Sequence, residues 1–172
     1  IESLREEVSL TYFEFNTLAA LIIFTQKSPQ IVLLEVGLGG RLDAANIIDS
    51  DVAVLTSVDL DHQQWLGETR AEIAKEKLGI ARANRPLIIG ESNYPDNFER
   101  NVENTRADTL WIGKDFGYKA QNQQFTVNLC TADNQPISVD KIANHGPLAV
   151  NKTIALQALT SLGCTLDSRI CR

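Results

Sequence analysis

Two groups of residues that could carry chemistry directly follow apolar runs. Glu35 follows the run "IVLL", and three glycines, Gly37, Gly39 and Gly40, come soon after it. The stretch "DLDH", which ends at His62, follows the run "VAVLTSV". If both runs are neighbouring strands of a parallel sheet, a carboxylate and an imidazole meet beyond the same edge of that sheet. The pair would then lie within reach of one ion.

Neither group is specific by itself. The glycines do not form G-x-G-x-x-G, and no G-x-x-x-x-G-K-[ST] phosphate loop occurs in the 172 residues, so a complete nucleotide-phosphate cradle is missing from them. A tight turn between strand and loop explains the glycines as well as a ligand loop does. His62 could equally be a hydrogen-bonded loop histidine. Spacing alone leaves these alternatives open.

A third candidate is Lys77, which helical spacing places on an apolar face. Its neighbours on that face are Ile73, Ala74, Ile80 and Ala81. Such a lysine either leads its ammonium out to water along a packed stem or is partly desolvated, with its neutral amine available for chemistry. Lys75, in a mixed and more exposed setting, is the comparison within the same helix.

The elements that would position these residues alternate along the first half of the chain. Apolar residues from Phe15 to Ile23 recur at helical spacing and predict a helix that ends near Lys27. Thr69, with Glu72 three residues later, predicts the start of a second helix. Continuous apolar runs predict buried strands at 31–36, 52–58 and 86–90. We therefore expect an α/β fold with a mostly parallel sheet covered by helices on both faces.

The second half of the chain is more polar. "TLWIG" and "QQFTVNLCT" predict short strands and a small antiparallel β addition. The segment "PLAVNKTIALQALTSLG" predicts a final helix with Gly163 as its C-cap. On one face of this helix we place Ala155, Ala158, Leu159 and Leu162.

Composition excludes several classes of function. Sixteen basic and 22 acidic residues give a formal charge of −6, which disfavours nucleic acid and anionic membranes as partners. We expect a small-molecule ligand instead. No apolar stretch approaches the length of a membrane span, and no signal segment opens the chain. Cys130, Cys164 and Cys171 have no metal-binding spacing, which predicts unpaired thiols in a reducing, cytoplasmic setting.

Five stretches in order carry a family resemblance: "FEFNTLAAL", "LLEVGLGGRLDAAN", "DHQQWLG", "EKLGIAR" and "GPLAVNKTIALQAL". Together they resemble the bifunctional dihydrofolate synthase/folylpolyglutamate synthase family of the Mur ligase superfamily, over nearly the whole chain. The resemblance implies an enzyme that phosphorylates a substrate carboxylate with ATP. The amine of L-glutamate then attacks the acyl phosphate and forms an amide, with dihydropteroate or a folate as the acceptor.

The resemblance also implies a metal site. Glu35 and His62 would bind Mg²⁺, although this ion prefers oxygen ligands to nitrogen. Lys77 would react with carbon dioxide and become a carbamate. The charge gives a reason, because a carbamate is an anion that can help to hold a second metal ion, whereas an ammonium would repel it.

For the pteroate substrate, the binding positions of the family fall on two segments. These positions are Thr11, Tyr12, Phe13 and Glu14 in the first segment, and Leu42, Asp43 and Ala44 in the second. We expect the Asp43 carboxylate to hydrogen-bond the amino-pyrimidine edge of a pterin and Phe13 to pack on its ring. Asn151 would contact the nucleotide.

The chain departs from the family pattern, and these departures limit the activity that we expect of residues 1–172. Ala45 stands where the family usually has threonine. The phosphate loop and the glutamate-binding carboxyl-terminal domain of such enzymes fall outside residues 1–172. We therefore expect the chain to be part of the central ATP-dependent ligase domain and to be inactive alone, with the intact enzyme a monomer.

Two alternatives remain. Another Mur-type peptide ligase would share the fold, but "YFEF" and "GGRLDA" disfavour it. A truncated, non-catalytic domain that only binds a pterin or a partner is the other. It predicts that restored flanks would not restore amide formation.

Overall fold

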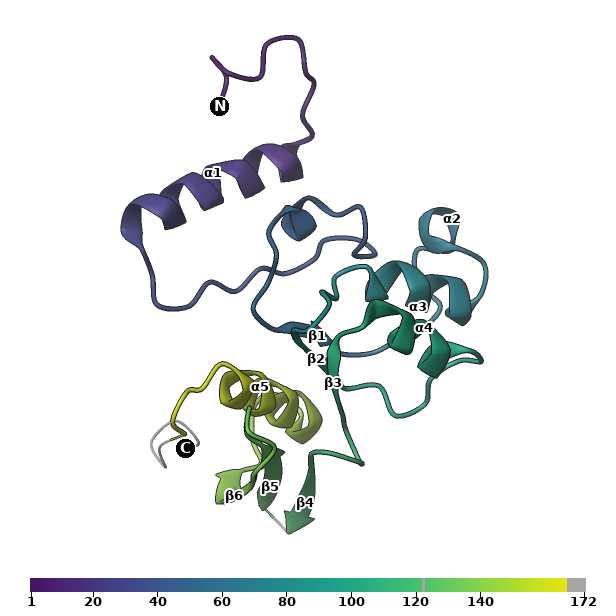
Figure 1. Cartoon of the computed structure of the whole chain (residues 1–172), viewed down its shortest axis with the longest axis vertical. Coiled ribbons are helices and arrows are strands. Elements are labelled where there is room, and N and C mark those ends of the chain that lie inside the picture. Colours follow the sequence, from purple (N-terminus) through teal and green to yellow (C-terminus); the bar gives the residue numbers. More distant parts are fainter. Residues whose placement is uncertain (122, 167–172) are drawn as a thin grey trace.

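The computed structural model describes residues 1–121 and 123–166, and a three-stranded parallel sheet lies at its centre (Figure 1). The strand order is β1-β2-β3, and Val54 of β1 and Leu110 of β3 both pair with Ile88 of β2. The strands are β1 (Ala53–Leu55), β2 (Pro86–Ile89) and β3 (Asp108–Trp111). The predicted strands at 52–58 and 86–90 are therefore confirmed, although β1 is shorter than predicted. The predicted strand "TLWIG", which we expected in the antiparallel addition, overlaps β3 instead and pairs in parallel with β2.

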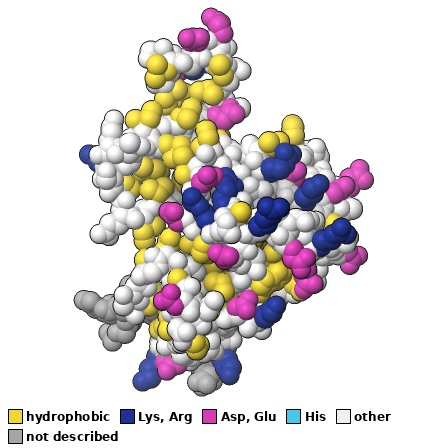
Figure 2. Space-filling view, viewed as in Figure 1, with side chains coloured by type: hydrophobic (Ala, Val, Ile, Leu, Met, Phe, Trp, Pro, Cys, Tyr) yellow, Lys and Arg dark blue, Asp and Glu magenta, His cyan; other side chains and the backbone are white. Residues whose placement is uncertain are grey.

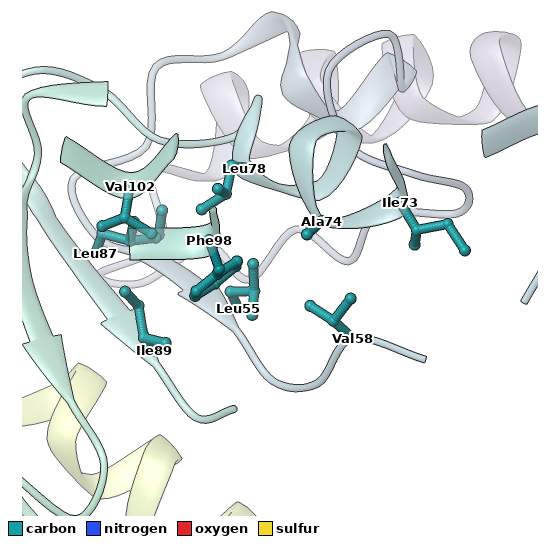
Figure 3. Packing of buried hydrophobic residues seen from close by; sticks show 10 residues of the cluster. Leu55, Val58, Ile73, Ala74, Leu78, Leu87, Ile89, Phe98 and Val102 are labelled. Atoms are coloured by element: carbon teal, nitrogen blue, oxygen red, sulfur yellow. The ribbon is translucent and has the colours of Figure 1, made fainter. Parts of the chain in front are cut away.

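One face of this sheet is covered by α3 (Arg70–Leu78) and α4 (Phe98–Thr105). The predicted start of α3 is confirmed, because the Thr69 hydroxyl accepts a hydrogen bond from the Glu72 backbone N–H and the Glu72 carboxylate accepts from the Thr69 N–H. Side chains of both helices and of β1 and β2 form one buried cluster (Figure 3). This cluster includes Leu55, Ile73, Leu87, Ile89 and Phe98.

The opposite face is covered by α5 (Ala149–Ser161), which also packs on a second sheet. That sheet is antiparallel, in the order β4-β5-β6. Its strands are β4 (Gly117–Gln121), β5 (Gln124–Cys130) and β6 (Pro136–Ala143). The predicted α/β architecture, a helix-covered parallel sheet with an antiparallel addition, is thus confirmed.

The buried face of α5 differs from the predicted one. Ala155 and Leu162 are exposed, whereas the buried residues are Thr153, Ile154, Leu156, Gln157 and Thr160. The prediction failed because three of these are polar and hide the apolar stripe. Each of them finds a partner inside: the Gln157 amide, for example, donates to the Cys130 carbonyl at 2.7 Å and accepts from its N–H at 3.0 Å. Gly163, directly after the helix, has the positive φ of 76° expected of a terminating glycine.

The N-terminal part holds α1 (Tyr12–Lys27), which ends where the sequence predicts. Thr11 and Glu14 form a capping box at its start, and Ser28 adopts the left-handed conformation at its end. None of its residues is buried, and Figure 2 shows hydrophobic side chains gathered over this part of the molecule. The helix packs mainly on the short 3-10 helix η1 (Ala44–Ile47).

The predicted strand at 31–36 is wrong for this structure. The segment is irregular, and Leu33 is 90% exposed. A strand exists only where a neighbour completes its hydrogen bonds. Within residues 1–121 and 123–166, no strand pairs with this segment.

Two further observations concern membrane-spanning helices and cysteines. Among the described residues, no helix combines the length and apolarity needed to cross a membrane. Cys130 and Cys164 are free thiols, as predicted, whereas Cys171 lies outside the described residues.

Candidate metal and substrate site

The glycine loop, Gly37–Gly40, lies against the C-terminal end of α3. At Gly40, whose φ is 156°, a Cβ atom would stand 3.0 Å from the carbonyl oxygens of Glu76 and Lys77. The Arg41 N–H donates to the Glu76 carbonyl at 2.9 Å, and the Arg41 guanidinium pairs with the Glu76 carboxylate. This close approach needs a residue without a side chain, which gives Gly40 a structural role beside Lys77.

The same loop lies beside α2 (Gln63–Leu66), the helix that follows His62. A Cβ atom on Gly39 would come 2.7 Å from Cδ2 of Leu66. His62 is the N-terminal boundary residue of α2, in the left-handed conformation with a φ of 50°. The structure thus brings the last residue of α2 and the end of α3 to the loop that follows segment 31–36.

The side chains of the three candidate residues, Glu35, His62 and Lys77, come together less closely than the segments that carry them. Glu35 and His62 are exposed, and the His62 Nε2 atom lies 3.6 Å from an Asp61 carboxylate oxygen. Lys77 is half-buried, whereas Lys75 is exposed, as the contrast between their positions predicts. Across the described ranges, no set of three or more His, Cys, Asp and Glu side chains is placed to hold a metal ion.

The donor set nevertheless suits a magnesium site completed by substrate. Mg²⁺ keeps several water ligands and is commonly held by one or two protein carboxylates together with phosphate oxygens. Glu35, whose side chain is exposed, would supply one such carboxylate. One nitrogen ligand from His62 is unusual but leaves room for these oxygens.

A cavity of about 350 Å³ opens between α1 and η1, and four predicted substrate residues line it: Glu14, Leu42, Asp43 and Ala44. This volume lies within the usual range for small-molecule sites. Leu10, Leu18 and Ile47 provide apolar walls, and Arg41 and Asn46 add polar groups. Residues that are distant in the sequence are therefore gathered around one space.

Asp43 has a structural role that sequence reasoning missed. Its Oδ2 accepts hydrogen bonds from the N–H groups of Gly37 and Leu38 at 3.0 and 2.9 Å, and its Oδ1 accepts from Ala45 N–H at 2.8 Å. A carboxylate has about four acceptor positions, so three of them are occupied by backbone. The signal was available, since an aspartate directly before a short helix commonly caps it. The Phe13 ring lies beside the same loop, 3.1 Å from the position of a Cβ on Gly37.

The remaining predicted residues lie around or away from this cavity. Thr11 is engaged in the capping box, and its N–H donates to the Glu14 carboxylate at 2.7 Å, which lowers the pKa of Glu14. Tyr12 is exposed. Asn151 is exposed in the first turn of α5, which covers the face of the parallel sheet opposite to α3. The structure does not join Asn151 to the cavity.

Comparison with known proteins finds relatives in the family that the sequence motifs indicate, and the matches extend along the whole chain. The Escherichia coli dihydrofolate synthase/folylpolyglutamate synthase is 40% identical over 176 aligned positions, which cover 100% of this chain and 40% of that protein. The Haemophilus influenzae protein of the same name is 47% identical over 141 residues, which cover 79% of this chain and 32% of that protein. The chain belongs to this family. No protein-family model matches it.

Solved structures of dihydrofolate synthase/folylpolyglutamate synthases have the same fold. Escherichia coli FolC in complex with DHPP and ADP matches with a TM-score of 0.89 and 38% identity, over 99% of this chain and 40% of that one. A bifunctional folylpolyglutamate synthase/dihydrofolate synthase with Mn, AMPPNP and L-glutamate bound matches with a TM-score of 0.85 and 36% identity, over 99% and 40%. The chain therefore spans about two fifths of the length of these relatives.

Proposed function

We propose that the protein carrying this chain is an ATP-dependent ligase that adds L-glutamate to dihydropteroate and to folates through an acyl phosphate. The observation that carries the proposal is the 40% identity to the bifunctional Escherichia coli enzyme over the whole chain. The cavity between α1 and η1 supports it independently, because it gathers residues from both predicted substrate segments.

The proposed metal ligands are Glu35 and His62, with Mg²⁺ as the ion. When bound, the ion would neutralise phosphate charge during formation of the acyl phosphate. The protein's part is to keep one carboxylate and one imidazole at the edge of the glycine loop. The related structure with Mn and AMPPNP supports a divalent ion beside a nucleotide.

Lys77 is proposed to act as a carbamate. Its neutral amine attacks the carbon of carbon dioxide, a C–N bond forms, and one N–H proton leaves to solvent. The product is an anion next to the glycine loop, where an ammonium would repel a metal ion. The half-buried position of Lys77 and the exposure of Lys75 support the choice of lysine.

For the substrates, we place the pterin of dihydropteroate or folate in the cavity, against Glu14, Leu42, Asp43 and Ala44. One acceptor position of the Asp43 carboxylate remains for a ligand N–H. Thr11, Tyr12 and Phe13 would flank the opening from α1, and Asn151 would meet the nucleotide from α5. The FolC complex with DHPP and ADP supports an active site that holds both kinds of ligand.

Residues 1–172 are proposed to be part of the central ligase domain of a cytoplasmic, monomeric enzyme. The phosphate loop and the glutamate-binding domain would be supplied by other parts of that enzyme. The 172 residues alone should then not catalyse ligation. Tight, saturable Mg-ATP binding by these residues in a calorimetric titration would contradict this expectation.

A chimera tests the function directly. The segment of the Escherichia coli relative that aligns with this chain is replaced by residues 1–172, and ADP release is measured with dihydropteroate, folate and L-glutamate. We expect release that depends on both the pterin acid and L-glutamate. A folded chimera that binds dihydropteroate without releasing ADP would support the non-catalytic alternative. Activity only with a nucleotide-linked sugar peptide would support the peptide ligase alternative.

The same chimera tests whether catalysis depends on Lys77 rather than on Lys75. Lys77→Ala should lower kcat by at least about 100-fold if the carbamate holds a metal ion during phosphoryl transfer. Lys75→Ala is the matched control on the exposed side of α3 and should leave kcat within about two-fold. Equal effects of the two substitutions would contradict the assignment.

A further inference from the structure

Two charged side chains outside the candidate site join the loops that follow β1 and β2. Glu91 comes shortly after β2, and Arg70 is the first residue of α3. Their side chains are only 12% and 28% exposed, and the Arg70 guanidinium lies 3.7 Å from the Glu91 carboxylate. A pair this sheltered from water is screened less than an ion pair on the surface.

Each of the two side chains contacts the backbone of both loops. The Glu91 carboxylate accepts from the N–H of Val58 at 2.8 Å and from the N–H of Asn93 at 2.7 Å. The Arg70 guanidinium donates to the carbonyl of Val58 at 2.9 Å and to the carbonyl of Asn93. Both backbone polar groups of Val58 and of Asn93 are therefore held by one carboxylate and one guanidinium.

This network ends directly before the loop that carries His62. Val58 is 1% exposed and belongs to the main core cluster, whereas Asp59, Asp61 and His62 are exposed. The partly buried network therefore holds the backbone at Val58, directly before the exposed residues of this loop. His62 itself enters α2 in the left-handed conformation, so its direction depends on where the preceding backbone leaves the sheet.

We propose that Glu91 and Arg70 are positioning residues that aim the segment 59–62 at the metal site. They touch neither substrate nor metal and act through the Val58 backbone. The part of this proposal that concerns the metal rests on the proposed function. The part that concerns the loop rests only on the hydrogen bonds, so the two can fail separately.

The first test is amide hydrogen exchange, read by NMR at single residues in the 172-residue chain. Glu91→Gln replaces with an N–H₂ group one of the two carboxylate oxygens that accept from Val58 and Asn93, so at least one of these two amides should exchange at least about ten-fold faster. The Leu87 and Ile88 amides, in the centre of the sheet, should be unchanged. The matched control is Glu99→Gln on α4, which makes the same change at an exposed carboxylate that lies outside the network and accepts a hydrogen bond from the Tyr94 hydroxyl.

The second test is the Mn²⁺ dependence of ligation by the chimera. Outer-shell residues that orient a metal ligand change metal affinity by about 10- to 100-fold. We therefore expect Glu91→Gln and Arg70→Met to raise the Mn²⁺ concentration for half-maximal rate by about ten-fold, with KM for the pterin acid changed little. Arg70→Lys, which retains charge but not the two-armed geometry, should lie between them and the parent.

The outcomes separate the two parts of the proposal. Unchanged exchange at both Val58 and Asn93 in Glu91→Gln would overturn it, as would faster exchange with an unchanged Mn²⁺ requirement. Faster exchange throughout the sheet, with a lowered melting temperature, would also overturn it, because the network would then be general support. If the parent chimera is inactive, the proposed function fails, and the positioning claim for the metal fails with it. The exchange measurement still decides whether the pair holds the loop.

Discussion

The sheet body, residues 53–111, and the N-terminal region, residues 1–50, are similar in sequence character but differ in burial. Both contain long apolar runs, and each contains a helix opened by a Thr–Glu capping box. Leu87, Ile88 and Ile89 of β2 are completely buried, whereas α1 buries no residue. The difference shows that a sequence pattern specifies a local element, while burial requires a partner on the other side. Four experiments test this difference in burial.

The largest effect should come from removing the same side chain in the two regions. Ile89 is fully buried in the sheet body, and Ile23 of α1 is 52% exposed. Ile89→Ala should lower the free energy of unfolding by about 2–5 kcal/mol, and Ile23→Ala by about 0.5 kcal/mol or less. Urea unfolding followed by circular dichroism measures both. Equal losses would show that α1 is packed in solution.

The contact between the two regions can be tested at Gly79. A Cβ atom there would come 2.4 Å from Cβ of Arg41, which belongs to the loop after the glycines. Gly79→Ala should therefore cost about 1–3 kcal/mol of unfolding free energy, because the loop must move away from α3. Gly117→Ala is the control, since its nearest neighbour would be 3.8 Å away. A cost at Gly117 equal to that at Gly79 would contradict the tight contact.

The two capping boxes allow a comparison of one motif in two settings. Thr69→Ala should lower the global unfolding free energy by about 1 kcal/mol, because α3 is part of the main core cluster. Thr11→Ala should reduce the helicity of α1 but leave the global value nearly unchanged, because α1 is not anchored in that core. Circular dichroism and urea unfolding separate these results. A global loss for Thr11→Ala would place α1 in the cooperative unit.

The smallest effect should be a dependence on acid pH. Hydrogen bonds from Thr11 and Thr69 lower the pKa of Glu14 and Glu72 below 4.5. A lowered folded-state pKa gives stability that is present above pH 4.5 and is lost as pH falls through the lower value. Glu72→Gln should therefore flatten the decline of stability as the pH falls below 4.5, more than Glu14→Gln does. An unchanged decline would show that the Glu72 cap does not contribute.

The sequence nominates residues for the candidate site, which remain a prediction, but it does not give their geometry. Glu35, His62 and Lys77 were found from their places after apolar runs and on a helix face, and their segments meet at the glycine loop. The backbone role of Asp43 was missed because a carboxylate in a substrate motif suggests a ligand contact first. Glu91 and Arg70 gave no signal, because an acid after a strand and a base at a helix start are ordinary features. Only their hydrogen bonds to four backbone groups, three of which join residues 12 to 33 positions apart, reveal the network.

By itself, the sequence determined the local elements and the family. Apolar runs, capping residues and terminal glycines predict β1, β2, α1, α3 and α5, since these depend on neighbouring residues. Tertiary structure decided what those elements bury. Among the residues that the structure describes, it left the 31–36 segment without a strand partner. It also placed three polar residues of α5 inside, where Thr153, Gln157 and Thr160 are satisfied by hydrogen bonds. Pairing and burial depend on groups far apart in the chain, so local periodicity does not fix them.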